Sequence, residues 1–252
     1  MYFNNIHILY YVLLVVIGLI VGNFIAWCNI RLPENKKIID KEFFKIYKTE
    51  VKNKYLMMFI VSISYIAILY KFGFKTLDLI KFLILTPLLI SAFVIDLKYR
   101  IIPNRLNMII FETGLIFTFI YGINNINLAT DMLLGMVTGA GIFLIITILG
   151  GLIAGKEAMG IGDVKLMGAL GLYFGVSSIV EISLLAVFLA GICIIGIVFV
   201  RAITKKKDEY IPFGPFLVLS AIACMFLPAK SVFITFMAMC QIISNKIIGE
   251  KI

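Results

Sequence analysis

Residues 8–30 read ILYYVLLVVIGLIVGNFIAWCNI, an apolar stretch without a single charged side chain. A helix that crosses a bilayer needs about 20 such residues, because its backbone groups must bond within their own segment. The rest of the chain is similar: 62% of its 252 residues are hydrophobic and only 15% are charged. Since about a quarter of the residues of a soluble domain are charged, the sequence predicts an integral membrane protein.

The first apolar stretch differs from a signal peptide. No lysine or arginine precedes it, and its apolar run is longer than the hydrophobic region of a typical signal peptide. Its basic residues follow it, from Arg31 onward. We therefore interpret 8–30 as a retained first helix with its N-terminus outside.

The predicted fold class is all-α, a polytopic bundle of transmembrane helices with about eight or nine spans. We expect one membrane domain over 1–252, with a short basic cytoplasmic loop, 31–54, after the first helix. The last segment follows a very short connection, so it is either a ninth span or an interfacial helix. The expected spans are 8–30, 56–72, 77–96, 105–122, 128–150, 164–176, 179–200, 212–227 and 231–248.

Lysine and arginine counts predict the orientation, because they are enriched in cytoplasmic connections. Segment 31–54 carries eight and segment 201–211 carries four, whereas 123–128 and 177–178 carry none. Basic connections on both sides of 164–200 require an even number of crossings between them. We therefore expect 164–176 to cross as well, although it is short for a span.

The composition weighs against several other classes of site. The four cysteines form no CxxC pair, and His7 is the only histidine, so we expect no metal, no cofactor and no histidine-based triad. The net charge of +9 lies mostly in connections that face anionic cytoplasmic lipid. The lipid bilayer is therefore an expected partner, and nucleic acid is not.

Most acidic residues near the spans have an ordinary interpretation. Asp78, Asp131 and Glu181 begin predicted helices, where carboxylates are common caps. Glu112 lies inside a span, and its role stays open. Gly135 and Gly139 form a GxxxG pair that predicts close helix packing.

Asp163 lies in the run Met159-Gly160-Ile161-Gly162-Asp163-Val164-Lys165, just before a predicted helix. It could be a simple cap. However, Gly160 and Gly162 permit close backbone approach or positive φ, which a cap does not require. Such a run can bring an extended substrate close to the carboxylate.

Asp96 closes the apolar run that begins at Leu88, at the carboxyl end of its helix. The helix dipole disfavours an anion there. A structural ion pair with Lys98 or Arg100 is the alternative to a functional role. The following Pro103 ends this helix, and Asn104 is a candidate cap for the next.

The predicted topology places Asp96 and Asp163 at the same, cytoplasmic, face. Two carboxyl groups close together share one proton, because both cannot ionise cheaply. The ionised member can then activate water while the protonated member polarises a peptide carbonyl. The helix ends suggest Asp163 as the base and Asp96 as the acid.

Four blocks of the sequence resemble the prepilin peptidases, the type IV leader peptidases among the GxGD aspartic proteases. The first block ends in Arg31-Leu32-Pro33. The second runs from Asp96 to Ile102-Pro103-Asn104, the third is Gly160-Ile161-Gly162-Asp163, and the fourth is Pro212-Phe213-Gly214-Pro215. Four blocks in family order are a far more specific signal than a lone GxGD.

The resemblance implies that Asp96 and Asp163 are catalytic and that the substrates are type IV prepilins or pseudopilins. It also implies a multi-pass protein of the cytoplasmic membrane whose active site faces the cytoplasm. Bifunctional members of this family carry CxxC pairs in the first cytoplasmic loop and methylate the product. Loop 31–54 has no cysteine, which excludes zinc there and weighs against methyl transfer.

Two rival interpretations and several open questions remain at this level. A secondary transporter would use Asp96 and Asp163 as ion or proton ligands, but their position at the membrane edge fits access to a cytoplasmic leader better. A protease of presenilin type shares the chemistry but not the Pro-Phe-Gly-Pro block. Lys165 and Lys98 could tune the two aspartates or bind substrate carbonyls. The sequence leaves the particular pilin, the pilus system and the oligomeric state open.

Overall fold

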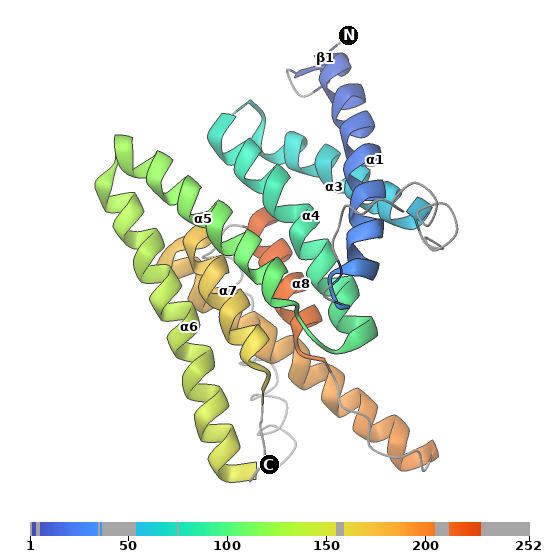
Figure 1. Cartoon of the computed structure of the whole chain (residues 1–252), viewed down its shortest axis with the longest axis vertical. Helices are drawn as coiled ribbons and strands as arrows, with labels where there is room; N and C mark the ends of the chain where they lie inside the picture. The colour runs from blue at the N-terminus through green and yellow to red at the C-terminus, as the bar shows by residue number, and fades with distance from the viewer. Residues whose placement is uncertain are drawn as a thin grey trace, which may run out of the picture. The chain divides into compact units, whose positions relative to one another are not determined.

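A computed structural model describes residues 2–3, 6–34, 36, 54–74, 76–154, 159–204 and 212–227. Helices make up nearly all of these residues, which confirms the all-α prediction. Two short strands precede the first helix and pair antiparallel, and His7 caps that helix by accepting the N–H of Leu9. The elements are β1 (Tyr2–Phe3), β2 (Ile6–His7), α1 (Ile8–Arg31), α3 (Lys54–Phe72), α4 (Thr76–Tyr99), α5 (Asn104–Asn124), α6 (Ile126–Ala154), α7 (Ile161–Thr204) and α8 (Gly214–Phe226) (Figure 1).

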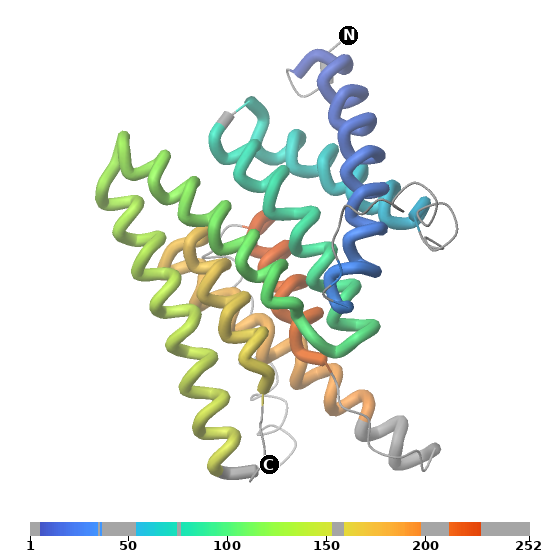
Figure 2. Tube along the Cα trace, viewed as in Figure 1, coloured from blue at the N-terminus to red at the C-terminus, as the bar shows by residue number. Residues whose placement is uncertain are grey.

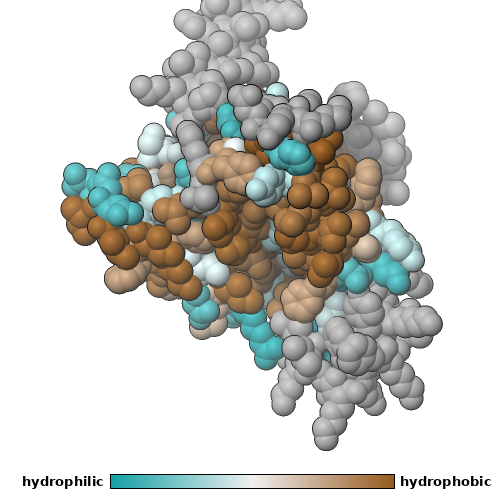
Figure 3. Space-filling model, turned by 90° about the horizontal axis from the view of Figure 1, so that it is seen from above, coloured by the Kyte–Doolittle hydropathy of each residue, from teal (hydrophilic) through white to brown (hydrophobic). Residues whose placement is uncertain are grey.

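Among the described residues, six helices are long and apolar enough to cross a membrane, namely α1, α3, α4, α5, α6 and α7. Apolar residues also predominate among the coloured atoms of the face drawn in Figure 3. The predicted count of eight or nine spans is not confirmed. The segments 164–176 and 179–200 lie on either side of a kink in α7, which counts as one of the six helices, and α8 is shorter than a typical span. The predicted segment 231–248 lies outside the described residues, as does most of loop 31–54.

The chain divides into two compact units, Met1–Thr113 and Gly114–Ile252, and the boundary falls within α5. The expected single domain therefore stays a prediction. In the first unit, α1 crosses α3 at close range (Figure 2). A Cβ atom added to Gly22 would lie 2.6 Å from the Cα atom of Met58, so glycine permits this contact.

In the second unit, α7 reverses direction at Gly175, whose backbone has φ 74° and ψ 179° (Figure 1). The sequence predicted this break at 177–178. Both resulting arms pack on α6, because an added Cβ at Gly139 would approach Met167 of the first arm and Ile179 of the second. The GxxxG pair thus mediates close helix packing, as predicted. The first arm, which carries Asp163, is held against α6 by contacts between backbones.

Asp131 lies beside this reversal. Its Oδ1 accepts the N–H of Val176 at 3.4 Å, and a Cβ atom on Gly175 would collide with its carboxylate. The expectation that Asp131 caps the start of its own helix is wrong, because α6 begins earlier and Asn125 caps it. Asp131 instead caps the second arm of α7, 45 residues away in the sequence.

We predict that Asp131→Ala lowers the free energy of unfolding by about 0.5–2 kcal/mol, the usual cost of a lost helix cap. Asp131→Asn should stay close to the parent, since its side-chain oxygen can accept the same N–H group. Thermal unfolding of the two variants in detergent measures the difference. Equal midpoints for alanine and asparagine would contradict the capping role.

Candidate active site

Asp96 is buried in the last turn of α4, with 4% of its surface exposed. The helix ends where Arg100 turns into the left-handed region, and the N–H of Arg100 donates to the carbonyl of Asp96 at 2.8 Å. The expected position of Asp96 at the carboxyl end of its helix is thus confirmed. The helix dipole disfavours an anion in the last turn of a helix.

The connection after Asp96 is short and rigid. Pro103 is buried, and its carbonyl accepts the N–H groups of Leu106 and Asn107, which opens α5. Asn104 is exposed and is the first residue of α5 rather than the residue before it. Pro103 suits this place because it has no N–H group to leave unsatisfied. The backbone hydrogen bonds of the Ile-Pro-Asn block therefore determine how the chain passes from the end of α4 to the start of α5.

A buried polar pair joins α1 to α4 below Asp96. The hydroxyl of Ser91 donates to the side-chain oxygen of Asn29, and both side chains are buried. Ser91 precedes Asp96 by about 7.5 Å along the helix axis. The sequence analysis did not single out Asn29 or Ser91. The available signal was that both are polar residues in apolar helices. Burying such a side chain without a hydrogen-bond partner is costly, so each could have been expected to have one.

The end of α1 carries a second buried polar group. Trp27 is fully buried, and the Arg31 guanidinium lies 4.5 Å from the centre of its ring. This cation–π contact stabilises a charge that is otherwise expensive to bury. The Arg31-Leu32-Pro33 block thus belongs to a packed helix end. The Asn29–Ser91 bond joins this end of α1 to α4.

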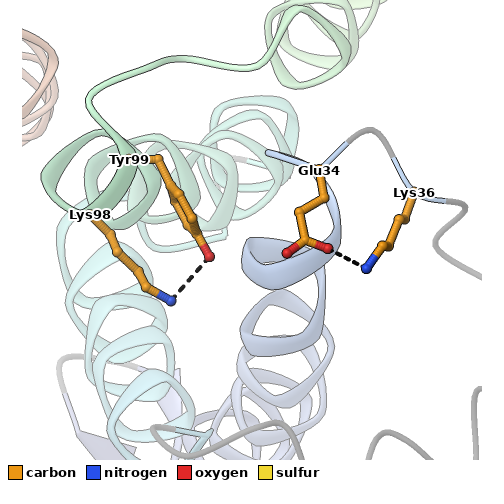
Figure 4. A network of polar contacts seen from close by, with 4 residues as sticks. All are labelled: Glu34, Lys36, Lys98 and Tyr99. Atoms are coloured by element: carbon orange, nitrogen blue, oxygen red, sulfur yellow. Dashed lines mark hydrogen bonds and ion pairs between the residues drawn. The ribbon is translucent and has the colours of Figure 1, made fainter.

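Charged side chains at the ends of α1 and α4 lie beside each other (Figure 4). Glu34 forms an exposed ion pair with Lys36 at 2.6 Å, and Lys98 donates to the Tyr99 hydroxyl at 3.0 Å. The hydrogen bond from Lys36 lowers the pKa of Glu34, and the charges of Lys36, Arg31 and Lys98 lower it further. Glu34 is therefore ionised at neutral pH, within a basic group of side chains.

Asp163 is buried in the first turn of α7, and its N–H donates to the carbonyl of Gly160 at 3.0 Å. A helix N-terminus favours a carboxylate. Among the described glycines, positive φ occurs at Gly73 and Gly175. Gly160 and Gly162 are therefore not required for a left-handed backbone. A Cβ atom on Gly160 would lie 3.8 Å from Oδ2 of Asp163. A side chain at position 160 would therefore lie in van der Waals contact with this carboxyl group.

The remaining candidate residues occupy the surface. Lys165 is exposed in the first turns of α7, and Glu112 is exposed on α5. Within the described part of the chain, no group of three or more His, Cys, Asp or Glu side chains could hold a metal ion. Asp96 belongs to the first unit and Asp163 to the second.

Comparisons with known proteins decide the family. A family model described as the type IV leader peptidase family matches residues 83–200, which include both aspartates. Leader peptidase HopD of Escherichia coli is 32% identical over 142 residues, which are 55% of this chain and 87% of that protein. The chain belongs to the type IV leader peptidase family. The resemblance inferred from the four sequence blocks is thereby confirmed.

Other members of the type IV leader peptidase family are longer. The prepilin leader peptidase/N-methyltransferase of Legionella pneumophila is 34% identical over 62% of this chain and 52% of its own length. A type 4 prepilin-like proteins leader peptide-processing enzyme of Escherichia coli O78:H11 is 33% identical over 58% of this chain and 51% of that enzyme. The chain spans about half the length of these relatives. No solved structure matches it.

Proposed function

We propose that this protein is a membrane aspartic endopeptidase that removes the leader from type IV prepilins or pseudopilins. The observation that carries the proposal is the pair of buried carboxyl groups, Asp96 and Asp163, at opposite kinds of helix end within the family's matched region. Buried carboxyl groups in polypeptides are rare unless they are paired or functional. The relatives named as leader peptidases support the same substrate class.

In the proposed mechanism, the two aspartates share one proton. Asp163 begins as the carboxylate because it lies at a helix N-terminus, and Asp96 begins protonated because it lies at a helix C-terminus. Asp163 takes a proton from water, and the resulting hydroxide attacks the peptide carbonyl carbon while Asp96 protonates the carbonyl oxygen. As the tetrahedral intermediate collapses, Asp96 takes back a proton from one of its two hydroxyl groups, the C–N bond breaks, and the proton held by Asp163 passes to the leaving amine.

We further propose that the site faces the cytoplasm, in a multi-pass protein of the inner membrane. The basic connections support this orientation. So does the position of Glu34 and Lys98 beside each other, since it puts the predicted cytoplasmic ends of α1 and α4 together. A substrate leader would then reach Asp96 from the cytoplasm, while the apolar segment of the substrate stays in lipid.

Cleavage alone is the activity that we propose. Some relatives are named as N-methyltransferases as well, but segment 31–54 contains no cysteine that could form a zinc site like that of bifunctional members. The product mass therefore carries a second piece of information. A further increment of one methyl group would show that methyl transfer occurs without this zinc site.

The test is reconstitution of the full chain in lipid vesicles with a purified prepilin, followed by mass measurement of the product. We expect the loss of a leader-sized fragment, and no loss with the double variant Asp96→Asn/Asp163→Asn. Intact substrate with the parent protein would overturn the proposal. If the same vesicles then carried an ion or proton flux that the double variant lacked, the transporter interpretation would replace it.

A further inference from the structure

Two helices of the first unit end in the same backbone geometry. Gly73 follows α3 with φ 58°, and its N–H donates to the carbonyl of Leu69 at 2.9 Å. Arg100 follows α4 with φ 59°, and its N–H donates to the carbonyl of Asp96 at 2.8 Å. Each is a helix end with a single residue in the left-handed region. One end uses glycine and the other uses arginine.

Glycine is the residue that this geometry favours, because a Cβ atom makes the left-handed region unfavourable. The space around Gly73 is open, with nothing within 4 Å of an added Cβ, so glycine is present there for its backbone freedom. Arg100 is the non-glycine residue with positive φ in the described part of the chain. The end of α4 therefore keeps a side chain where glycine would be easier to accommodate.

The helix dipole gives only a partial reason for a cation at this place. Cations stabilise helix C-termini, but Lys98 already lies in the last turn of α4. Arg100 is exposed, and it is attached through its own main-chain N–H to Asp96. Strained residues concentrate where they contact ligands. The main chain of Arg100 thus lies one helical turn beyond Asp96, and its charged side chain is exposed there.

We propose that Arg100 is a substrate-binding residue, whose guanidinium donates to main-chain carbonyl oxygens of the peptide held beside Asp96. This inference rests on the proposed peptidase function. Guanidinium presents several N–H donors in one plane and stays charged, which suits the carbonyl oxygens that every extended peptide offers. Lysine has a single, more flexible donor group and should replace it only in part.

The experiment compares Arg100→Gly, Arg100→Asn and Arg100→Lys with the parent protein in the vesicle cleavage assay. Glycine and asparagine both tolerate the left-handed region, so their thermal midpoints should equal or exceed that of the parent. We expect their KM to rise about tenfold or more while kcat stays within about twofold, since a contact made equally in the ground and transition states changes KM. The KM of Arg100→Lys should lie between the KM values of these two variants and that of the parent.

Gly73→Arg is the matched control, because it introduces the same residue into the same geometry away from Asp96. Its thermal midpoint should fall while its KM stays at the parent value. The assay is run in phosphatidylcholine vesicles with and without phosphatidylglycerol. A KM rise in both supports a contact with substrate, whereas a rise only with the anionic lipid indicates a headgroup contact and overturns the assignment.

Three further outcomes bear on this assignment and on the proposed function. If the parent cleaves the prepilin and Arg100→Gly has the parent KM, Arg100 does not bind substrate and the peptidase function stands. If the parent does not cleave the prepilin at all, both proposals are wrong. If the thermal midpoint and the activity of Arg100→Gly both fall, Arg100 has a structural role only, which would also overturn the assignment.

Discussion

Asp163→Asn should reduce prepilin cleavage by about 10⁴-fold or more, and Asp96→Asn should do the same, because catalytic groups that act as one unit lose nearly everything when either is removed. Asparagine keeps the shape of aspartate but can neither take a proton from water nor donate one from a carboxyl group. The measurement is the initial rate of leader removal in vesicles, followed by mass. The double variant should be no slower than either single variant.

Glu112→Gln is the matched control for these two substitutions. It removes a carboxylate from the same unit as Asp96, but Glu112 is exposed on α5, so cleavage should continue at the parent rate. The dependence of the parent rate on pH should show two apparent ionisations that belong to the aspartate pair. A single asparagine variant that cleaves within about tenfold of the parent would exclude the two-aspartate mechanism.

Gly135→Ala should destabilise the second unit severely, although it adds only one methyl group. The new Cβ atom would lie 2.6 Å from the carbonyl oxygen of Gly171, a separation that side chains do not adopt. Since the obstacle is backbone, α6 and the first arm of α7 must move apart. Overpacking of this kind costs about 1–3 kcal/mol, and cleavage should fall as well, because the same arm carries Asp163.

Gly141→Ala, on the same helix, should instead stabilise the protein. Nothing lies within 4 Å of a Cβ atom added to Gly141, so alanine gains about 0.5–1 kcal/mol from its better helix propensity. Thermal unfolding in detergent compares the two variants directly. Midpoints that move in the same direction by similar amounts would show that the contact between Gly135 and Gly171 does not hold α7 in place.

Sequence reasoning located the helices well for a definite reason. A polypeptide in lipid must satisfy its backbone hydrogen bonds within each segment, so an apolar run of about 20 residues has almost no alternative to a helix. The predicted spans 8–30, 56–72, 77–96, 105–122 and 128–150 accordingly coincide with α1, α3, α4, α5 and α6. The placement of Asp96 in a last helical turn and Asp163 in a first one follows from the same rule.

The contacts between helices could not be predicted in this way. The bond between Asn29 and Ser91 joins residues 62 apart in the sequence, and the bond from Val176 to Asp131 joins residues 45 apart. Such pairs depend on how each helix is rotated and how deep it lies. Hydropathy carries little of that information, since lipid-facing and buried sides of these helices are both apolar.

The sequence by itself therefore determined the membrane class, the helices α1 and α3 to α6, the break in α7, the family and the two candidate aspartates. Only the tertiary structure decided that Asp131 caps the second arm of α7, and that Gly135 and Gly139 are the residues of α6 that contact α7. The physical reason is that helix formation in lipid is a local requirement of each segment. Packing between helices is instead decided by close contacts at a few small or polar residues, each of which needs a partner from a distant part of the chain.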